Sequence, residues 1–91
     1  MKARVHIIVQ GIVQGVFFRY RTQQKAIELG CTGWVKNLAD GGVEIICEGE
    51  RQAVEKLAEW ARIGPSGAFV EKCDISWEAY TGGFHSFEIR H

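Results

Sequence analysis

The sequence predicts a single α+β domain in which two helices cover one face of a four- to five-stranded antiparallel sheet. Three observations lead to this fold class. The chain has 91 residues, the size of one small domain. Hydrophobic residues recur at every second position in some segments and at helical spacing in others. These segments alternate along the whole chain, with no repeat or linker between them.

The first part of the chain alternates between strand and helix. Residues 5–10 have the period of two, rich in β-branched side chains, that is typical of a strand. Gly11 and Gly15 follow, which indicates that the chain turns after this strand. From Phe18 to Leu29 the apolar residues take helical spacing, and Gly30 fits the end of that helix. A second strand is predicted over residues 32–38.

The second part of the chain contains a hairpin, a helix and two more strands. Asp40-Gly41-Gly42 is a turn signal before a strand at 43–48. Residues 51–63 carry one apolar stripe at helical spacing. Strands are predicted at 70–77 and 87–89. The resulting order is β-α-β-β-α-β-β, whose first six elements match the ferredoxin-like split β-α-β sandwich.

The composition excludes several classes of protein. Eleven basic residues balance eleven acidic ones, whereas sequence-independent nucleic-acid binding needs a basic surplus. We therefore expect no nucleic-acid partner, and any anion site must rest on a few placed groups. No segment approaches the ~20 apolar residues of a membrane span, so no membrane partner is expected. Cys31, Cys47 and Cys73 form no paired metal-binding motif, so we expect no metal and reduced thiols in a cytoplasmic protein.

The segment from Gly11 to Arg19 is the candidate functional site. It joins a predicted strand to a helix, and a glycine-containing loop there presents backbone N–H groups and the helix dipole to one point. Arg19 falls in the first helical turn, where its guanidinium can reach the same anion. The spacing alone fits a tight turn followed by a surface arginine equally well. The loop contains no nucleotide-binding or nucleophilic-cysteine motif.

Two motifs resemble those of one enzyme family. Residues 11–19, GIVQGVFFR, resemble the acylphosphatase signature GxVQGVxFR, and residues 33–37, GWVKN, resemble its second stretch, GWVxN. The similarity extends over the whole chain, so residues 1–91 are expected to form a single acylphosphatase-like domain. The resemblance implies a small-molecule acyl phosphate substrate, inorganic phosphate as product and inhibitor, and no cofactor.

The resemblance also implies the roles of individual residues. Arg19 would bind the substrate phosphate, and Asn37 would orient the attacking water. The backbone of the loop would form a phosphate cradle from Gln14, Gly15, Val16, Phe17 and Phe18. Without the motif, Asn37 would be interpreted as a strand-end residue that caps the following turn.

Acyl phosphate hydrolysis needs few protein groups. The leaving carboxylate has a conjugate acid with a pKa of about 4, so it departs without a general acid. The loose transition state of phosphoryl transfer is stabilised mainly by positioning and charge. Two alternatives remain: a non-catalytic ferredoxin-like module that binds RNA or another ligand, and a module that handles carbamoyl phosphate in a larger assembly. We expect a monomer.

Overall fold

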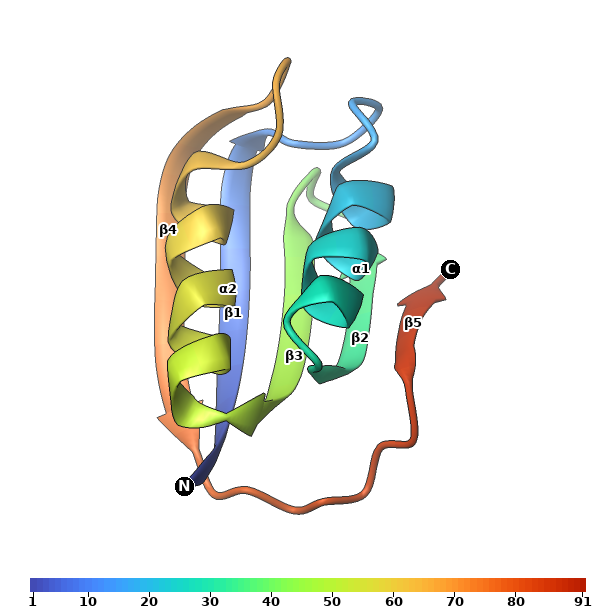
Figure 1. The fold of residues 1–91 in the computed structure, drawn as a ribbon. Helices are drawn as coiled ribbons and strands as arrows, with labels where there is room; N and C mark the ends of the chain where they lie inside the picture. Colours follow the sequence, from blue (N-terminus) through green and yellow to red (C-terminus); the bar gives the residue numbers. More distant parts are fainter.

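The structure, a computed structural model, describes residues 1–91. Two helices cover one face of a five-stranded sheet, as Figure 1 shows. The elements are β1 (Lys2–Ile12), α1 (Phe18–Glu28), β2 (Thr32–Asn37), β3 (Val43–Glu50), α2 (Arg51–Ile63), β4 (Phe69–Glu78) and β5 (Phe87–Arg90). Their order is the predicted one, and α2 has the predicted bounds.

The sheet is mixed rather than purely antiparallel, which corrects one detail of the prediction. Its strand order is β4-β1-β3-β2-β5. β1 pairs antiparallel with β3 and β4, and β2 pairs antiparallel with β3, but β5 lies parallel to β2. Residues 79–86 carry the chain from β4 along one end of the sheet to the opposite edge (Figure 1). β5 therefore starts at the end where β2 also starts, and a parallel pair results.

Of the two glycines that indicate a turn, Gly11 still lies in β1 and only Gly15 lies in the loop after it. β1 continues to Ile12, and its pairing with β4 shifts between Gln10 and Gly11 as a β-bulge. Gly11 has a φ of 132°, and a side chain there would collide with the carbonyl oxygen of Phe69. Glycine is needed for the bulge and for this close approach of two backbones, not for a turn.

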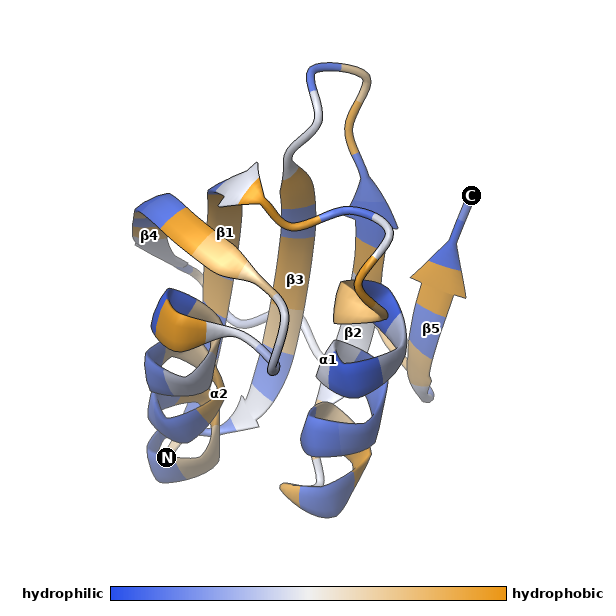
Figure 2. Cartoon of the chain, turned by 90° about the horizontal axis from the view of Figure 1, so that it is seen from above, coloured by the Kyte–Doolittle hydropathy of each residue, from blue (hydrophilic) through white to orange (hydrophobic).

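The core lies between the sheet and the two helices. Alternate residues of β1 face the helices and are buried, as period-two patterning requires, whereas in β3 every residue from Ile45 to Gly49 is buried. Figure 2 shows hydrophobic residues along these strands, whereas α1 is mostly hydrophilic. α1 buries only three residues, so few side chains fix it to the sheet. The core side chains of the strands and α2 include Val5, Ile7, Val9, Val43, Ile45, Val54, Leu57 and Ala61.

Two further observations concern the helices and the cysteines. Neither helix has the length and apolar character that crossing a membrane would require. Cys31 and Cys47 are buried in the core, and Cys73 is half-buried against it. The cysteines therefore fill space beneath the helices, as their scattered positions in the sequence suggest.

A buried carboxylate fastens the connection between β4 and β5. Glu48 is 0% exposed. It accepts hydrogen bonds from the Thr81 N–H and hydroxyl (both 2.9 Å), from the Gly82 N–H (3.0 Å) and from Arg4 Nη1 (3.1 Å). Burial alone raises the pKa of Glu48, but these hydrogen bonds outweigh it and the pKa is lower than usual. The chain that leads into β5 is thus tied to β3.

Glu48→Gln is expected to lower the free energy of unfolding at neutral pH by about 2–3 kcal/mol, because an amide cannot satisfy all these donors. With a lowered folded-state pKa, the carboxylate stabilises the fold above its unfolded pKa of about 4.3. This contribution disappears as the pH falls through the folded-state pKa. Urea denaturation at several pH values should show the difference between wild type and variant narrowing in acid.

The matched control is Glu55→Gln, which removes an exposed carboxylate paired with Arg51 on α2. It should change the free energy of unfolding by less than about 0.5 kcal/mol. A difference between wild type and Glu48→Gln that stays constant into acid would show that the charge of Glu48 does not stabilise the fold.

Candidate active site

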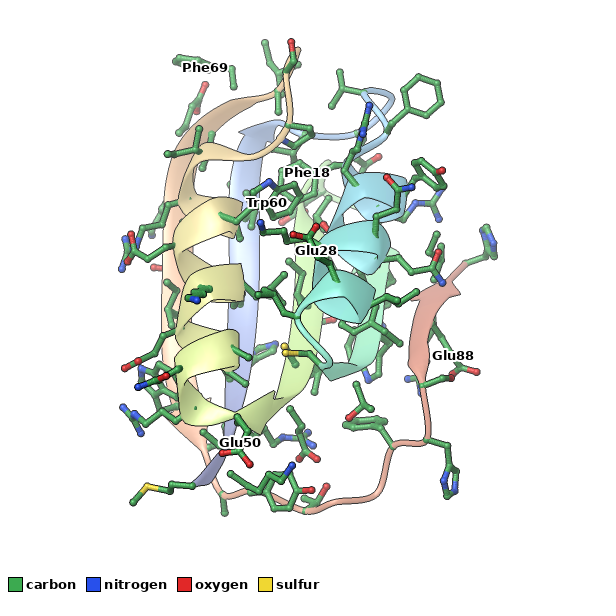
Figure 3. All side chains as sticks on the ribbon, in the orientation of Figure 1. Phe18, Glu28, Glu50, Trp60, Phe69 and Glu88 are labelled. Atoms are coloured by element: carbon green, nitrogen blue, oxygen red, sulfur yellow. The ribbon has the colours of Figure 1, made fainter.

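The loop between β1 and α1 has an unusual backbone at two positions. Gly15 has a φ of 76°, and Phe17, the residue before the helix, has a φ of 61°. The left-handed region is rare for a residue with a large side chain, and in such residues it is often found at functional sites. Phe18 then anchors the loop, because its buried ring packs against Trp60 of α2 with centroids 5.6 Å apart (Figure 3).

The start of α1 offers backbone N–H groups that no protein atom accepts. The first backbone hydrogen bond of the helix runs from the Arg21 N–H to the Phe17 carbonyl (2.9 Å). The helix has no side-chain cap and no acidic residue in its first turn. The loop residues 14–17 donate no backbone hydrogen bond either. These free donors and the positive end of the helix dipole together suit an anion.

The Arg19 guanidinium lies beside these donors. It forms no ion pair with a carboxylate. Its Nη1 donates to the carbonyl oxygen of Arg90 at 3.2 Å and lies 3.3 Å from Nδ1 of His91. These contacts use one guanidinium nitrogen, so the other two remain for a bound anion.

Asn37 ends β2 and is half-buried. Its side-chain amide forms no hydrogen bond with the protein, so it does not cap the following turn. Asp40 does that instead: its Oδ1 accepts from the Gly42 N–H at 2.9 Å. The Asn37 amide keeps both a donor and an acceptor free for a small molecule.

Arg19 and Asn37 line the same pocket, which has a volume of about 350 Å³. The sheet explains why they meet. β1 runs in the same direction as β2 because both are antiparallel to β3, and β5 is parallel to β2. The C-terminal ends of β1, β2 and β5 therefore lie at the same end of the sheet. This places the loop after β1 next to Asn37 and the end of β5.

Most of the predicted cradle residues line this pocket, but one does not. Gln14, Gly15, Phe17 and Phe18 border it together with Arg19 and Asn37. Val16 does not line it and instead faces a neighbouring pocket between the helices. Four other lining residues are not among the predicted site residues, namely Val13, Tyr20, Ile89 and His91. The residues from β5 could not be identified because its direction in the sheet cannot be read from the sequence.

Gln14 has a structural role that the sequence did not suggest. Its Nε2 donates to the carbonyl oxygens of Leu38 and Gly42, both at 2.8 Å. Both protons of the side-chain amide are thereby used, so the backbone N–H is the one hydrogen-bond donor of Gln14 that remains for a ligand. Gln14 thus bridges the loop and the turn that directly follows Asn37, which fixes the distance between the two halves of the pocket.

The pocket is electropositive and contains no carboxylate. None of its lining residues is Asp or Glu. No three His, Cys, Asp or Glu side chains gather closely enough anywhere in the structure to hold a metal ion. The groups that converge here are a guanidinium, free backbone N–H groups and a neutral amide. Together they can bind a small oxyanion and orient one neutral molecule next to it.

Comparisons with known proteins identify relatives along the whole chain. The family model described as acylphosphatase matches residues 5–89. An acylphosphatase of Pyrobaculum aerophilum is 51% identical over 88 residues, covering 96% of this chain and 93% of that protein. One from Pelotomaculum thermopropionicum is 48% identical, covering 97% and 96%. A crystal structure of acylphosphatase from Bacillus subtilis superposes with a TM-score of 0.93 at 37% identity, covering 100% of both chains.

Gln14→Ala is expected to lower the free energy of unfolding by about 1–3 kcal/mol, because it removes two hydrogen bonds that join the loop to the turn. The Leu38 and Gly42 carbonyl oxygens each keep one backbone donor, from Gly41 and Leu38. Gln14→Glu keeps the shape of the side chain but sets a carboxylate against these oxygens, and should cost at least as much. Urea denaturation measures both. The control Gln24→Ala removes an exposed glutamine that bonds only Tyr20, and should cost less than about 0.5 kcal/mol. Equal effects of the two alanine variants would contradict the bridging role of Gln14.

Proposed function

This chain belongs to the acylphosphatase family, whose function is the hydrolysis of acyl phosphates, and on that premise we propose that the reaction takes place between Arg19 and Asn37. One observation carries the proposal: a free guanidinium, uncapped N–H groups and a free amide line a single pocket. The substrate is a small acyl phosphate. Its phosphoryl group is the part that this pocket would hold.

The phosphoryl group binds to the loop. The backbone N–H groups of residues 14–18, at the positive end of α1, donate hydrogen bonds to its oxygens, and Arg19 binds two of them with its planar fork. These donors stand in place before the substrate arrives, because Gln14 and Phe18 hold the loop on either side. Preorganised donors stabilise the charge of the transition state without reorganising. Inorganic phosphate has the same oxygens and should inhibit competitively.

Asn37 orients the attacking water. Its amide oxygen can accept a hydrogen bond from the water and its NH₂ can donate one to a phosphoryl oxygen, which aligns the water with phosphorus. The leaving group is a carboxylate, whose conjugate acid has a pKa of about 4, so no protein acid is needed. A phosphoryl oxygen takes the proton that the water loses. The bond from phosphorus to the acyl oxygen breaks as the bond to water forms.

The remaining expectations concern the state of the protein. We propose that it works as a monomer, because a single chain supplies the guanidinium, the backbone N–H groups and the amide that the proposed reaction needs. We propose a cytoplasmic location, in keeping with three unpaired thiols.

Arg19→Gln and Asn37→Ala should separate binding from turnover. Arg19→Gln should abolish competitive inhibition by phosphate and lower kcat/KM for benzoyl phosphate by at least about 1,000-fold, since it removes charge from the transition state. Asn37→Ala should keep the inhibition constant of phosphate within about threefold but lower kcat by at least about 100-fold. A continuous benzoyl phosphate assay with added phosphate measures both. Near-wild-type turnover by Asn37→Ala would exclude the role of Asn37.

Catalysis should be independent of metal and restricted by the leaving group. EDTA should leave kcat/KM for benzoyl phosphate unchanged, because the carboxylate departs without an acid or a Lewis acid. The monoester p-nitrophenyl phosphate should react slower by at least about 100-fold, since its leaving oxygen is more basic and no carboxyl side chain lines the pocket to protonate it. Similar rates on the two substrates, or loss of activity with EDTA, would contradict this mechanism.

A further inference from the structure

A second pocket borders the first and has a volume of about 360 Å³. Its walls come from α1, from Trp60 of α2 and from the segment that follows α2. Figure 3 shows Trp60 and Glu28 on the sides of the two helices that face each other. Phe17 lines both pockets and is 77% exposed. Its ring is therefore the boundary between them, and a ligand in one pocket can extend past it into the other.

The second pocket carries an excess of positive charge. Arg21 and Lys25 line it together with one carboxylate, Glu28. Lys25 pairs with Glu28 at 3.8 Å. The guanidinium of Arg21 therefore forms no ion pair, and it donates no hydrogen bond to the protein. A guanidinium stays charged at any physiological pH. An exposed pocket with an uncompensated guanidinium favours an anionic ligand group.

The direction of the reaction points the substrate toward this pocket. In an in-line displacement the attacking and leaving oxygens lie on opposite sides of phosphorus. If Asn37 of β2 holds the water, the acyl group leaves on the side away from the sheet. The pocket that contains Asn37 is lined by residues from β2 and β5, whereas the second pocket has none from the sheet. The acyl group is thus directed past Phe17 to the helix side.

We propose that the second pocket binds a negatively charged terminal group of the acyl moiety, with Arg21 as its main partner and Lys25 in support. The chain then prefers acyl phosphates whose acyl group ends in an anion over neutral ones of the same length. This inference rests on the proposed function, because it needs the phosphoryl group in the loop. It assigns a recognition role to residues that take no part in the chemical step.

Matched pairs of substrates test the proposal. Succinyl and butyryl phosphate have the same chain length and differ only in a terminal carboxylate, and adipyl and hexanoyl phosphate form a longer pair. For wild type, the ratio of kcat/KM between charged and neutral substrate should be about fivefold or more in at least one pair. Arg21→Gln should bring that ratio close to one. The control Lys72→Gln removes the same charge from β4, on the opposite edge of the sheet, and should keep the wild-type ratio.

Each other outcome has a definite meaning. A wild-type ratio near one in both pairs, or a ratio that Arg21→Gln leaves unchanged, overturns the proposed role of the second pocket in binding the charged acyl group. Turnover of butyryl phosphate in the same assay would still support the proposed function. An equal drop in Arg21→Gln and Lys72→Gln shows a long-range charge effect and also overturns it. If no acyl phosphate is hydrolysed by folded wild-type protein, the proposed function and this inference fail together.

Discussion

The site depends on backbone N–H groups that the protein leaves without acceptors. Every helix begins with donors that lack intrahelical partners, and a side-chain cap often satisfies one of them. Here the cap position is Phe17, whose side chain has no hydrogen-bond acceptor, and the first turn contains no acidic residue. These donors lose hydrogen bonds to water when a ligand enters unless the ligand replaces them. A phosphoryl group does so with several oxygens at once, which makes the uncapped helix start selective for it.

The mixed sheet brings the other groups to these donors. β1, β2 and β5 run in the same direction, so their C-terminal ends lie at one end of the sheet. The loop, Asn37 and the Arg90 carbonyl, which accepts a hydrogen bond from Arg19, meet there. An antiparallel β5 would have placed Arg90 at the opposite end of the sheet. The connection that gives β5 its direction is fastened by Glu48, far from the pocket. A buried charge at one end of the sheet therefore supports the strand that contacts Arg19 at the other.

Local patterns in the sequence predicted the elements well, and longer-range relations could not be read from it. The apolar stripe fixed the bounds of α2, because helical spacing depends only on neighbouring residues. The direction of β5 depends on the path that residues 79–86 take along the end of the sheet, and no local pattern in the sequence indicates that path. The family resemblance implies a phosphate-binding role for the backbone of Gln14 and says nothing of its side chain, so the side-chain contacts leave that prediction as it stands. The side chain turns to Leu38 and Gly42, and these partners come together only once β2 and β3 have paired.

The distribution of ion pairs explains how a chain with no net charge can hold an anion. Most lysines and arginines pair with a carboxylate, and the exceptions are Arg19, Arg21, Lys56 and Arg90. Arg19 and Arg21 lie in the first turn of α1, and Arg90 ends the strand beside it. Two unpaired positive charges thus lie next to the uncapped start of α1, whereas the Arg90 guanidinium lies over the Trp34 ring of β2 and Lys56 lies on α2. Composition reports only the sum of the charges, whereas binding depends on which of them the fold leaves without a partner.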